Sequence, residues 1–308
     1  CQSNGIGASD TLAAPAATLP VNRWIIGEVA ATVTRMEEAF AAYRFDDAAN
    51  AIHQFAWGSF CDWYLELIKG QIDTETKAVA GWVLDQILVM LHPFMPFITE
   101  ELWSKLGDRA AYPLITAKWP EPGASVDAEA KAEVEAIIEV ISGIRAQRAE
   151  VGIPPSAVLA TAILQDSTGI VDVVNRWSNT LARMARIRPA EVQRTQHDGF
   201  VIGSDSLTDQ FIVQTKFDTT SFTAIQFPVG ANTLIAAVDG IVDLAAEKAR
   251  LTKALEAAGK EAASLEGRLN NPAFVEKAKP EAVDKARADH ADKTAEVERL
   301  TAALERLG

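Results

Sequence analysis

The side chains that most often carry out chemistry in proteins are few in this chain of 308 residues, and they stand far apart. The histidines and cysteines are His53, His92, His197, His290, Cys1 and Cys61. No histidine pairs with a cysteine or a carboxylate at metal-ligand spacing, so we predict that all four are structural or face solvent. Cys61 stands among aromatic residues, which predicts a buried thiol and not a nucleophile. The chain also lacks a P-loop and a glycine-rich dinucleotide turn, so no catalytic site is predicted.

Residues suited to binding are better represented than catalytic ones. In the first predicted helices, the cationic, aromatic and amide side chains near helix ends are Arg23, Arg35, Arg44, Phe45 and Asn50. Exposed aromatic rings there could stack on unpaired RNA bases, and arginines could position phosphates. The alternative for each of them is an ordinary surface side chain.

Two further groups of polar residues stand at the ends of predicted helices. Arg145 and Arg148 lie three residues apart on one face of a helix that stops before Pro154 and Pro155. They are either a solvated basic edge or phosphate ligands. The second group surrounds a later helix break and consists of Arg268, Asn271, Phe274, Lys277 and Lys279.

Helical periodicity predicts that the first group of candidate binding residues, from Arg23 to Asn50, lies on helices, because apolar residues recur at three- and four-residue steps. The predicted helices cover residues 22–40, 46–68, 74–91 and 128–149. Three tryptophans are assigned to their shared core: Trp57, Trp63 and Trp82. Residues 21–155 are therefore predicted to form a helical bundle. Residues 1–20 are rich in Ala, Gly, Ser and Thr, which is typical of a linker or frayed end.

The segment LHPFMPFITEELW, residues 91–103, connects two of these helices. Pro93 and Pro96 each remove a backbone donor, so the helix that ends near Leu91 must break here. Thr99 with the following acidic and apolar residues marks a new helical start. The segment is thus predicted to be a helix–hinge–helix element of the core.

Residues 156–240 contain short apolar runs rich in β-branched residues and separated by Gly and Asp-Gly. The predicted strands cover residues 157–164, 200–202, 211–213, 222–227 and 233–238. One helix is predicted over 170–187. This pattern predicts a small α/β connector.

Residues 241–308 are dominated by Ala, Glu, Lys, Arg and Leu. Apolar residues at alternating steps of three and four form a seam from Leu244 to Leu269, and a second seam runs from Val283 onward, with His290 at a register-setting position. The break at Asn270-Asn271-Pro272 predicts an antiparallel coiled-coil hairpin. The fold class predicted for the whole chain is therefore mainly α.

The hinge LHPFMPFITEELW resembles that of the anticodon-binding domain shared by the valyl, isoleucyl, leucyl and methionyl branch of class I aminoacyl-tRNA synthetases. The segments NRWI, YRFDDAANAIHQFAW, FCDWYLELIK and IRAQRAEVGIPPS stand in the order and spacing of that family. GIVDLAAEKARLTKALE and NNPAFVEKAKPEAVDKAR resemble the C-terminal arm of bacterial valyl-tRNA synthetases. The isoleucyl enzymes typically end in a zinc module, for which this chain has no cysteines after Cys61. The chain is therefore similar to the C-terminal, non-catalytic part of a bacterial valyl-tRNA synthetase.

The resemblance implies that the bundle binds the anticodon stem-loop of a valine-specific tRNA and that the tip of the hairpin contacts the tRNA elbow. The alternative at the tip is an ordinary solvated helix end. The HIGH and KMSKS signatures of the family's adenylate site are absent from this sequence. No cofactor is therefore expected in this chain, whereas the parent enzyme would use ATP and magnesium. The catalytic domain of the same polypeptide is the other expected partner, and a monomer is expected.

Charge and hydropathy limit the choice of partners. The net charge of −13 argues against a broad surface that coats nucleic acid. Residues 241–308 hold 12 Lys+Arg and 13 Asp+Glu, which leaves 17 basic and 29 acidic residues before them, so the hairpin is the better candidate for phosphate contact. No apolar run approaches the ~20 residues of a membrane span, and no signal-peptide pattern is present, so we expect a cytoplasmic protein. Because the sequence lacks an initiator Met, we expect a fragment of a longer chain.

Two functions of other classes stay open. A structural adaptor would present its coiled coil to another coiled coil, and a dimer that exchanges arms without RNA affinity would favour it. A free-standing tRNA-binding factor would be encoded by its own reading frame, and the missing initiator Met argues against it.

Overall fold

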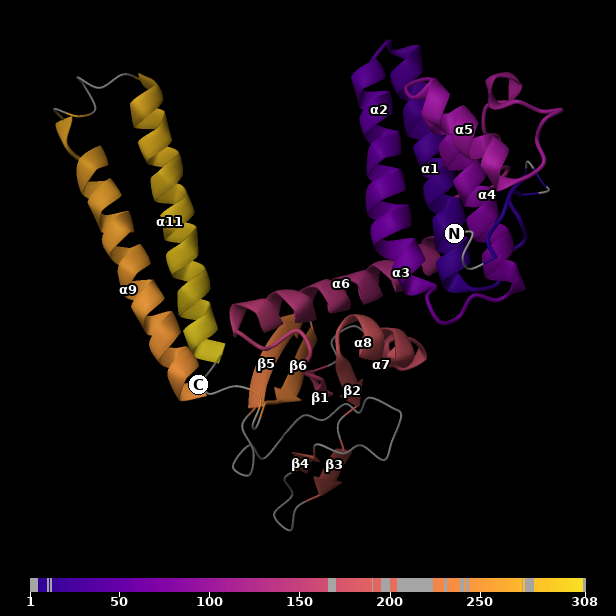
Figure 1. Ribbon diagram of the computed structural model, residues 1–308. Coiled ribbons are helices and arrows are strands. Elements are labelled where there is room, and N and C mark those ends of the chain that lie inside the picture. Colours follow the sequence, from indigo (N-terminus) through magenta and orange to yellow (C-terminus); the bar gives the residue numbers. More distant parts are fainter. Residues whose placement is uncertain are drawn as a thin grey trace. The chain divides into compact units, whose positions relative to one another are not determined.

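Figure 1 shows a mainly α-helical chain, which confirms the predicted fold class. The computed structural model describes residues 5–9, 11, 13–165, 170–189, 191–194, 200–203, 224–229, 232–238, 241, 244–272, 274 and 280–306. The chain divides into two compact units, Cys1–Ile138 and Glu139–Gly308. The finer division at residues 20, 155 and 240 remains a prediction.

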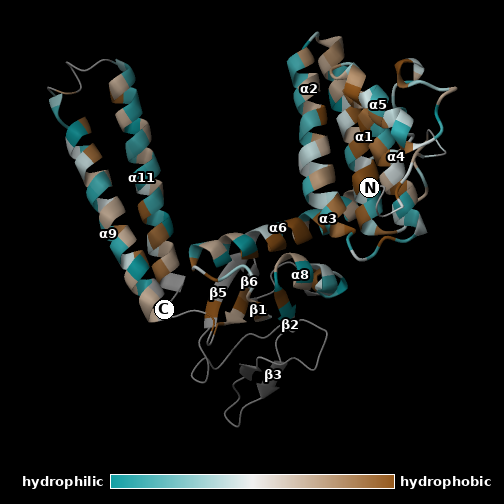
Figure 2. Ribbon diagram, viewed as in Figure 1, coloured by the Kyte–Doolittle hydropathy of each residue, from teal (hydrophilic) through white to brown (hydrophobic). Residues whose placement is uncertain are grey.

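The first unit is a helical bundle, and its helices α1, α2, α4 and α5 lie side by side (Figure 1). The elements are α1 (Pro20–Ala41), α2 (Phe45–Gln54), α3 (Leu65–Leu67), α4 (Thr74–Leu91), α5 (Pro96–Leu106) and a 3-10 turn at Leu114–Thr116. The predicted helices over 22–40 and 74–91 are confirmed. Figure 2 shows hydrophobic residues gathered on α1 and α4, and the fully buried Ile25, Met36 and Trp82 belong to this interior.

Between α2 and α3 the chain continues as a π-helix, η2 (Phe55–Tyr64). A π-helix has i→i+5 hydrogen bonds and therefore more residues per turn than an α-helix. Its buried side chains are accordingly spaced by five and then four residues, at Phe55, Phe60 and Tyr64. The predicted helix over 46–68 is thus continuous, but its middle turns present different side chains to the core than an α-helix would.

This change of period overturns two predictions of burial. Trp57 was assigned to the core, but its exposed fraction is 65%. Cys61 was predicted to be buried, but it is exposed. Partial desolvation and the nearby Asp62 raise the pKa of the Cys61 thiol, which disfavours the nucleophilic thiolate, as predicted. Trp82 is buried as predicted, and Trp63 is half-buried.

A carboxylate from α4 holds the N-terminus of α1. Glu75 accepts hydrogen bonds from the backbone N–H groups of Thr18 and Leu19 (3.0 Å each), the Thr18 hydroxyl (2.6 Å) and the Asn22 amide (2.9 Å). The buried Asn22 in turn accepts a hydrogen bond from the Tyr64 hydroxyl at 2.8 Å. Desolvation raises the pKa of Glu75, but the hydrogen bonds from Asn22, Thr18 and Leu19 outweigh it and lower the pKa to about 2. The network ties α1, η2 and α4 together.

The predicted break between two helices is confirmed, since α4 ends at Leu91, but α5 begins at Pro96 and not at Thr99. The segment is only partly in the core, because Met95, Phe97 and Ile98 are 50%, 90% and 48% exposed.

The Thr99 hydroxyl donates to the carbonyl oxygen of Met95 at 2.8 Å, and it lies 2.8 Å from His92 Nδ1. Because this hydroxyl has a single proton, Nδ1 is the donor when the proton is used on Met95. His92 therefore has a structural role, as predicted.

The prediction of a linker or frayed end over residues 1–20 is wrong for the described part of that segment. Ile6 is 1% exposed, and the backbone N–H of Ala8 donates to Leu106 O at 3.2 Å. A Cβ at Gly81 of α4 would lie 2.5 Å from Gly7 O, so glycine at this position permits the close approach. Small residues pack this segment on α4, although its composition is that of a linker.

Helix α6 (Ala128–Glu150) begins in the first unit and ends in the second, and it confirms the predicted helix over 128–149. The second unit contains a mixed sheet of order β2-β1-β6-β5, in which β1 pairs with β2 in parallel and with β6 antiparallel. Its elements are β1 (Leu159–Gln165), α7 (Ile170–Arg176), α8 (Ser178–Met184), β2 (Ile187–Pro189), β5 (Ala224–Val229) and β6 (Asn232–Ala237). Two more strands, β3 (Glu191–Arg194) and β4 (Phe200–Gly203), form an antiparallel pair.

The predicted α/β connector is confirmed in kind, with one correction. The single helix predicted over 170–187 is wrong, because the chain breaks at Trp177 and α8 ends at Met184. Arg186 then adopts a left-handed backbone with φ of 54°, which ends the helix and lets the buried Ile187 join the sheet. The strand predicted over 211–213 lies outside the described residues.

The predicted hairpin is formed by α9 (Leu244–Leu269) and α11 (Pro280–Arg306), which lie side by side and antiparallel (Figure 1). Buried seam residues include Leu251, Ala258 and Val283. Lys293 Nζ lies 2.8 Å from carboxylate oxygens of both Glu261 and Glu296, so one of its ion pairs joins the two helices. The seam is narrow, and Figure 2 shows mostly hydrophilic residues on the rest of both helices.

We predict that Glu75→Gln lowers the free energy of unfolding of the bundle by about 1–3 kcal/mol, because it weakens the charge-assisted hydrogen bonds to Thr18, Leu19 and Asn22. The pKa of Glu75 falls from 4.5 to about 2 on folding, so the ionised carboxylate stabilises the fold above pH 4.5. This stabilisation is lost as the pH falls through the folded-state pKa. The difference between the two proteins should therefore shrink from pH 4.5 toward pH 2.

Urea unfolding followed by tryptophan fluorescence measures this effect, because six of the seven tryptophans lie before residue 120. Glu37→Gln, at an exposed position of α1, is the matched control and should change the free energy of unfolding by less than about 0.5 kcal/mol. A Glu75→Gln effect that is the same at every pH would contradict the role given to the carboxylate.

Candidate functional site

Three of the residues singled out from the sequence line one surface groove of the first unit, between the C-terminal half of α1 and helix α2. We call it the α1–α2 groove, and its volume is about 490 Å³. Its polar lining consists of Arg35, Glu38, Arg44, Asp47, Asn50 and Gln54. The groove therefore mixes cationic, acidic and amide groups, which suits a ligand with both phosphates and hydrogen-bonding edges.

The two arginines of the groove are held differently. Arg35 donates from Nη2 to the Thr32 hydroxyl at 3.1 Å, so its side chain lies along α1. Arg44 stands directly before α2, its side chain is 65% exposed, and it forms an ion pair with Asp47. An exposed ion pair of this kind contributes little stability. Arg44 can therefore exchange Asp47 for an external phosphate at low cost.

An exposed aromatic ring stands next to Arg44. Phe45 is 56% exposed, and its ring centroid lies 6.1 Å from that of Phe40. The Phe40 ring is itself stacked on Phe94, with ring centroids 6.2 Å apart, and forms a T-shaped pair with Trp119 at a centroid distance of 5.6 Å. Phe45 is thus an exposed ring on a rigid aromatic base, which is a suitable geometry for stacking a planar group.

Tyr43 lies two residues before Phe45, and it was not among the residues singled out from the sequence. It has a left-handed backbone with φ of 59°, which is uncommon for a residue with a Cβ. Its side chain is 82% exposed. Two aromatic rings therefore stand in solvent at the start of α2, Tyr43 in the turn after α1 and Phe45 as the first residue of α2. The sequence feature that could have indicated an exposed Tyr43 is the end of the apolar periodicity after Phe40.

Arg23 does not belong to the groove. Its guanidinium lies 3.1 Å from Asp127 and 3.9 Å from Glu129, and its side chain is 32% exposed. These contacts join the start of α1 to the start of α6. Arg23 thus has a structural role in the bundle.

Arg148 is neither a solvated basic edge nor a phosphate ligand. It is 6% exposed, and its four Nη protons are directed at four backbone carbonyl oxygens at 2.6–3.2 Å. The acceptors are Pro154, Ala157, Ala185 and Arg186. Burial, and secondarily Arg186, lowers the pKa of the guanidinium. The sequence could not show this, because the acceptors come from loops up to 38 residues away.

Arg145 is only partly committed to the same packing. Its Nε donates to Met184 O at 3.0 Å, so it supports the contact between α6 and α8 within the second unit. The two arginines therefore connect the end of α6 to the α/β connector.

The structure brings three of the predicted residues together at the tip of the hairpin. The Arg268 guanidinium lies 4.2 Å from the centroid of the Phe274 ring, and the Phe274 N–H donates to Asn271 O at 3.0 Å. Arg268 and Asn271 are exposed, and Phe274 is half-buried. Lys277 and Lys279 lie outside the described residues.

Among the residues that the structure describes, no group of three or more His, Cys, Asp or Glu side chains is placed to hold a metal ion. The described helices include none that is both long and apolar enough to cross a bilayer. His53 is exposed, His290 is half-buried at the seam, and His197 lies outside the described residues.

We predict that Arg148→Ala lowers the free energy of unfolding by about 3 kcal/mol or more, because it leaves several buried carbonyl groups without a donor. Arg145→Ala removes a single hydrogen bond and should cost about 1 kcal/mol. Hydrogen exchange of the β1 and β2 amides measures both effects. Equal, small losses in the two variants would contradict the structural assignment of Arg148.

Two family models match this sequence. The anticodon-binding domain of tRNA ligases matches residues 22–163, which contain the bundle and the α1–α2 groove. The valyl tRNA synthetase tRNA binding arm matches residues 243–308, which contain the α9–α11 hairpin.

The chain is 50% identical to a valine–tRNA ligase from Sphingopyxis alaskensis and 48% identical to one from Rhizorhabdus wittichii, in both cases over all of its length. It is 38% identical to a valine–tRNA ligase from Zymomonas mobilis over 99% of its length. It covers 34%, 32% and 33% of these proteins, so it spans about a third of the length of the curated relatives. The predicted resemblance is confirmed: the chain belongs to the valine–tRNA ligase family, of which it carries the anticodon-binding domain and the tRNA-binding arm.

Proposed function

We propose that this chain binds tRNA at two places, the anticodon stem-loop at the α1–α2 groove and the tRNA elbow at the tip of the hairpin. The observation that supports the first place is the joining of Arg35, Arg44 and Asn50 in one groove beside two exposed rings, Tyr43 and Phe45. Single-stranded loops are where proteins read RNA sequence, by stacking splayed bases on aromatic rings and bonding to their edges.

Two side chains of the groove and one ring beside it have distinct parts in this proposal. The Phe45 ring stacks on an unpaired nucleobase, since the ring is exposed and is held in place by its contact with Phe40. Arg44 leaves Asp47 and pairs with a phosphate. Asn50 offers a donor and an acceptor to a base edge. Arg23 and Arg148, which are occupied in the fold, are not part of the contact surface.

The arm contributes a small cationic and aromatic tip. Arg268 over Phe274 presents a planar guanidinium that can lie against a base or a phosphate of the elbow. Asn271 beside it is exposed. Lys277 and Lys279 are proposed to add charge at the same tip. A narrow-seamed hairpin can bend toward its target, so the tRNA would set the direction of the arm.

The whole enzyme is proposed to join valine to its tRNA with ATP and magnesium, as a cytoplasmic monomer. The two contacts would orient the acceptor end of the tRNA toward a catalytic domain beyond this chain. This chain alone is expected to bind tRNA without activating valine, and valine-dependent pyrophosphate exchange by the chain would contradict that.

The first prediction concerns the two contacts together. Binding to valine tRNA, followed by fluorescence anisotropy across a salt titration, should weaken with salt because counterions are released from phosphates. A changed anticodon and a disrupted elbow should each weaken binding as well. Sensitivity to the elbow alone would remove the groove from the proposal, and absence of binding at low salt would contradict the proposal as a whole.

The second prediction compares Phe45, the exposed ring beside the groove, with an exposed ring elsewhere on the surface. Phe45→Ala should weaken tRNA binding by about 5- to 150-fold, which corresponds to the ~1–3 kcal/mol of one base–aromatic stack. Trp57→Ala is the matched control, because Trp57 is also exposed but lies on η2, whereas Phe45 directly follows the groove residue Arg44. Equal losses in the two variants would contradict a specific role for Phe45.

The third prediction concerns the arm. Arg268→Ala should lower the slope of log affinity against log salt by about 1, as expected for the loss of one phosphate contact. Arg287→Ala, at an exposed position of α11 that pairs with Asp284, should leave the slope unchanged. An unchanged slope in Arg268→Ala would remove that residue from the elbow contact.

A further inference from the structure

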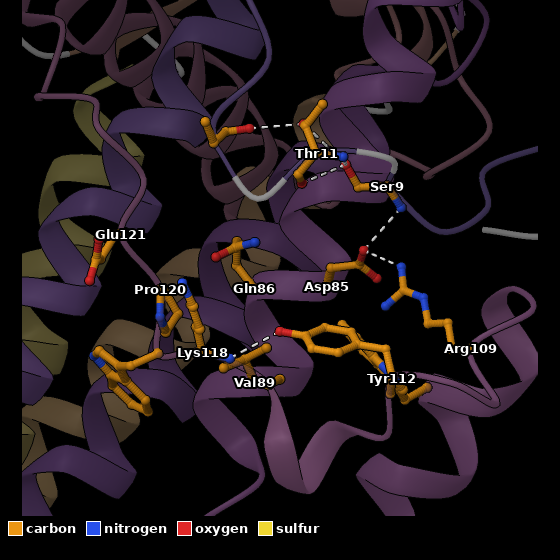
Figure 3. Close-up of a pocket in the computed structure, with 14 residues that line it drawn as sticks. Ser9, Thr11, Asp85, Gln86, Val89, Arg109, Tyr112, Lys118, Pro120 and Glu121 are labelled. Carbon is orange, nitrogen blue, oxygen red and sulfur yellow. Dashed lines mark hydrogen bonds and ion pairs between the residues drawn. The ribbon is translucent and has the colours of Figure 1, made fainter.

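A second cavity of the first unit is not used by the proposed tRNA contacts. It lies between the N-terminal segment, α4, α5 and the loop that follows α5, and its volume is about 500 Å³ (Figure 3). We call it the Asp85 cavity. Its size falls within the ~300–1,000 Å³ that is typical of small-molecule sites.

Asp85 and Arg109 line this cavity and form an ion pair through a single hydrogen bond. Asp85 Oδ2 accepts from both Arg109 Nη2 and the backbone N–H of Ser9, the latter at 2.9 Å (Figure 3). The Asp85 and Arg109 side chains are 7% and 10% exposed. Nevertheless, Asp85 Oδ1 and Arg109 Nη1 find no hydrogen-bond partner among the described residues. A carboxylate and a guanidinium usually pair through two bonds, so this single-bonded pair leaves one acceptor and one donor available to a ligand.

A third polar atom and several flat walls complete the cavity. Trp119 Nε1 lines it and is likewise buried without a partner in the described part of the chain. The Trp103 ring carries the Arg109 guanidinium 3.6 Å above its centroid, and its own Nε1 donates to Tyr112 O at 2.9 Å. Val89 and Pro120 add apolar surface. Leaving three buried polar atoms unbonded costs free energy, which a ligand that bonds to them would recover.

The chemistry of the three atoms limits the ligand. The pair is neutral overall, and Asp85 Oδ1 would repel an anion while Arg109 would repel a cation. Burial raises the pKa of Asp85, against the effects of Arg109 and Ser9. The complementary group is therefore uncharged, with an N–H for Oδ1 next to an acceptor for Arg109 Nη1 or Trp119 Nε1. The edge of a nucleobase has this pattern, and its ring fits flat aromatic and apolar walls.

We propose that the Asp85 cavity binds a nucleobase through a neutral donor–acceptor edge, with Asp85 as acceptor and with Arg109 and Trp119 as donors. The base comes either from a free nucleoside or from an unpaired stretch of RNA. This site is separate from the α1–α2 groove, and the inference does not rest on the proposed function.

The test uses two nucleosides that differ at one atom. Uridine, followed by the NMR signal of the Trp119 indole N–H, should bind in a saturable manner. In 3-methyluridine a methyl group replaces the hydrogen of the N–H group that would donate to Asp85. The affinity of 3-methyluridine should therefore be at least about 10-fold lower than that of uridine, which corresponds to the loss of one charge-assisted hydrogen bond. Absence of uridine binding at millimolar concentration, or equal binding of the two nucleosides, would overturn the proposal and leave a cavity that holds water only.

Two variants assign the contacts. Trp119→Phe keeps the aromatic wall but removes the indole donor, and it should weaken uridine binding several-fold. Asp85→Asn should abolish the preference for uridine over 3-methyluridine, because its amide oxygen stays on Arg109 and Ser9 and its NH2 group takes the place of Oδ1. Asp85→Asn leaves Arg109 without its counter-charge, so the folding of this variant is checked by urea unfolding. If Asp85→Asn does not fold, the uridine affinity of Trp119→Phe tests the proposed contacts. Unchanged uridine affinity in Trp119→Phe would contradict the proposed geometry.

A single-stranded oligouridylate distinguishes the two sources of the base. Tighter binding than uridine, lost in Trp119→Phe, would assign the cavity to unpaired RNA, whereas equal affinity would assign it to free nucleosides. Phe45→Ala should leave uridine binding intact. If the unaltered chain bound uridine but not tRNA, the result would therefore count against the groove and not against the cavity.

Discussion

The first unit depends on one carboxylate that closes the end of a helix from a distance in sequence. Glu75 satisfies the N–H groups of Thr18 and Leu19, where α1 begins, and the amide of Asn22 one turn later. Tyr64 bonds to the other end of the same amide. Helix N-termini have unpaired donors and a partial positive charge, so a half-buried anion there fixes both the position and the direction of the helix. The α1–α2 groove is built on the helix that this carboxylate anchors.

The arginines of this chain show how environment assigns a role to a residue type. Arg148 is surrounded by carbonyl oxygens and has become part of the fold, whereas Arg44 has one exposed carboxylate partner and remains available. Arg268 has an aromatic ring as its neighbour and exposes its guanidinium at the tip of the hairpin. The acidic net charge of the chain is thus compatible with the proposed nucleic-acid binding, because the proposed contacts are local.

An aromatic cluster connects the two candidate sites of the bundle. Phe40 contacts Phe45 beside the groove and Trp119 at the Asp85 cavity. It also stacks on Phe94 in the hinge between α4 and α5. The hinge that the two prolines create is therefore more than a reversal of the chain, because it supplies a ring that supports both surfaces. Packing of this kind is rigid, since aromatic pairs have preferred geometries and little rotational freedom.

The sequence by itself determined the mainly α class, the bundle, the hinge at Pro93 and Pro96, the connector and the hairpin seam, because these follow from periodicity and from residues that break helices. It also placed Arg35, Arg44, Phe45 and Asn50 among the candidates for binding. It could not reveal the π-helical turns, which leave Trp57 and Cys61 exposed, because their hydrogen bonding has no distinct signature in composition. Only the tertiary structure decided that Arg148 is buried and that Asp85 meets Arg109, since burial and pairing depend on segments that are distant in the chain and adjacent in space.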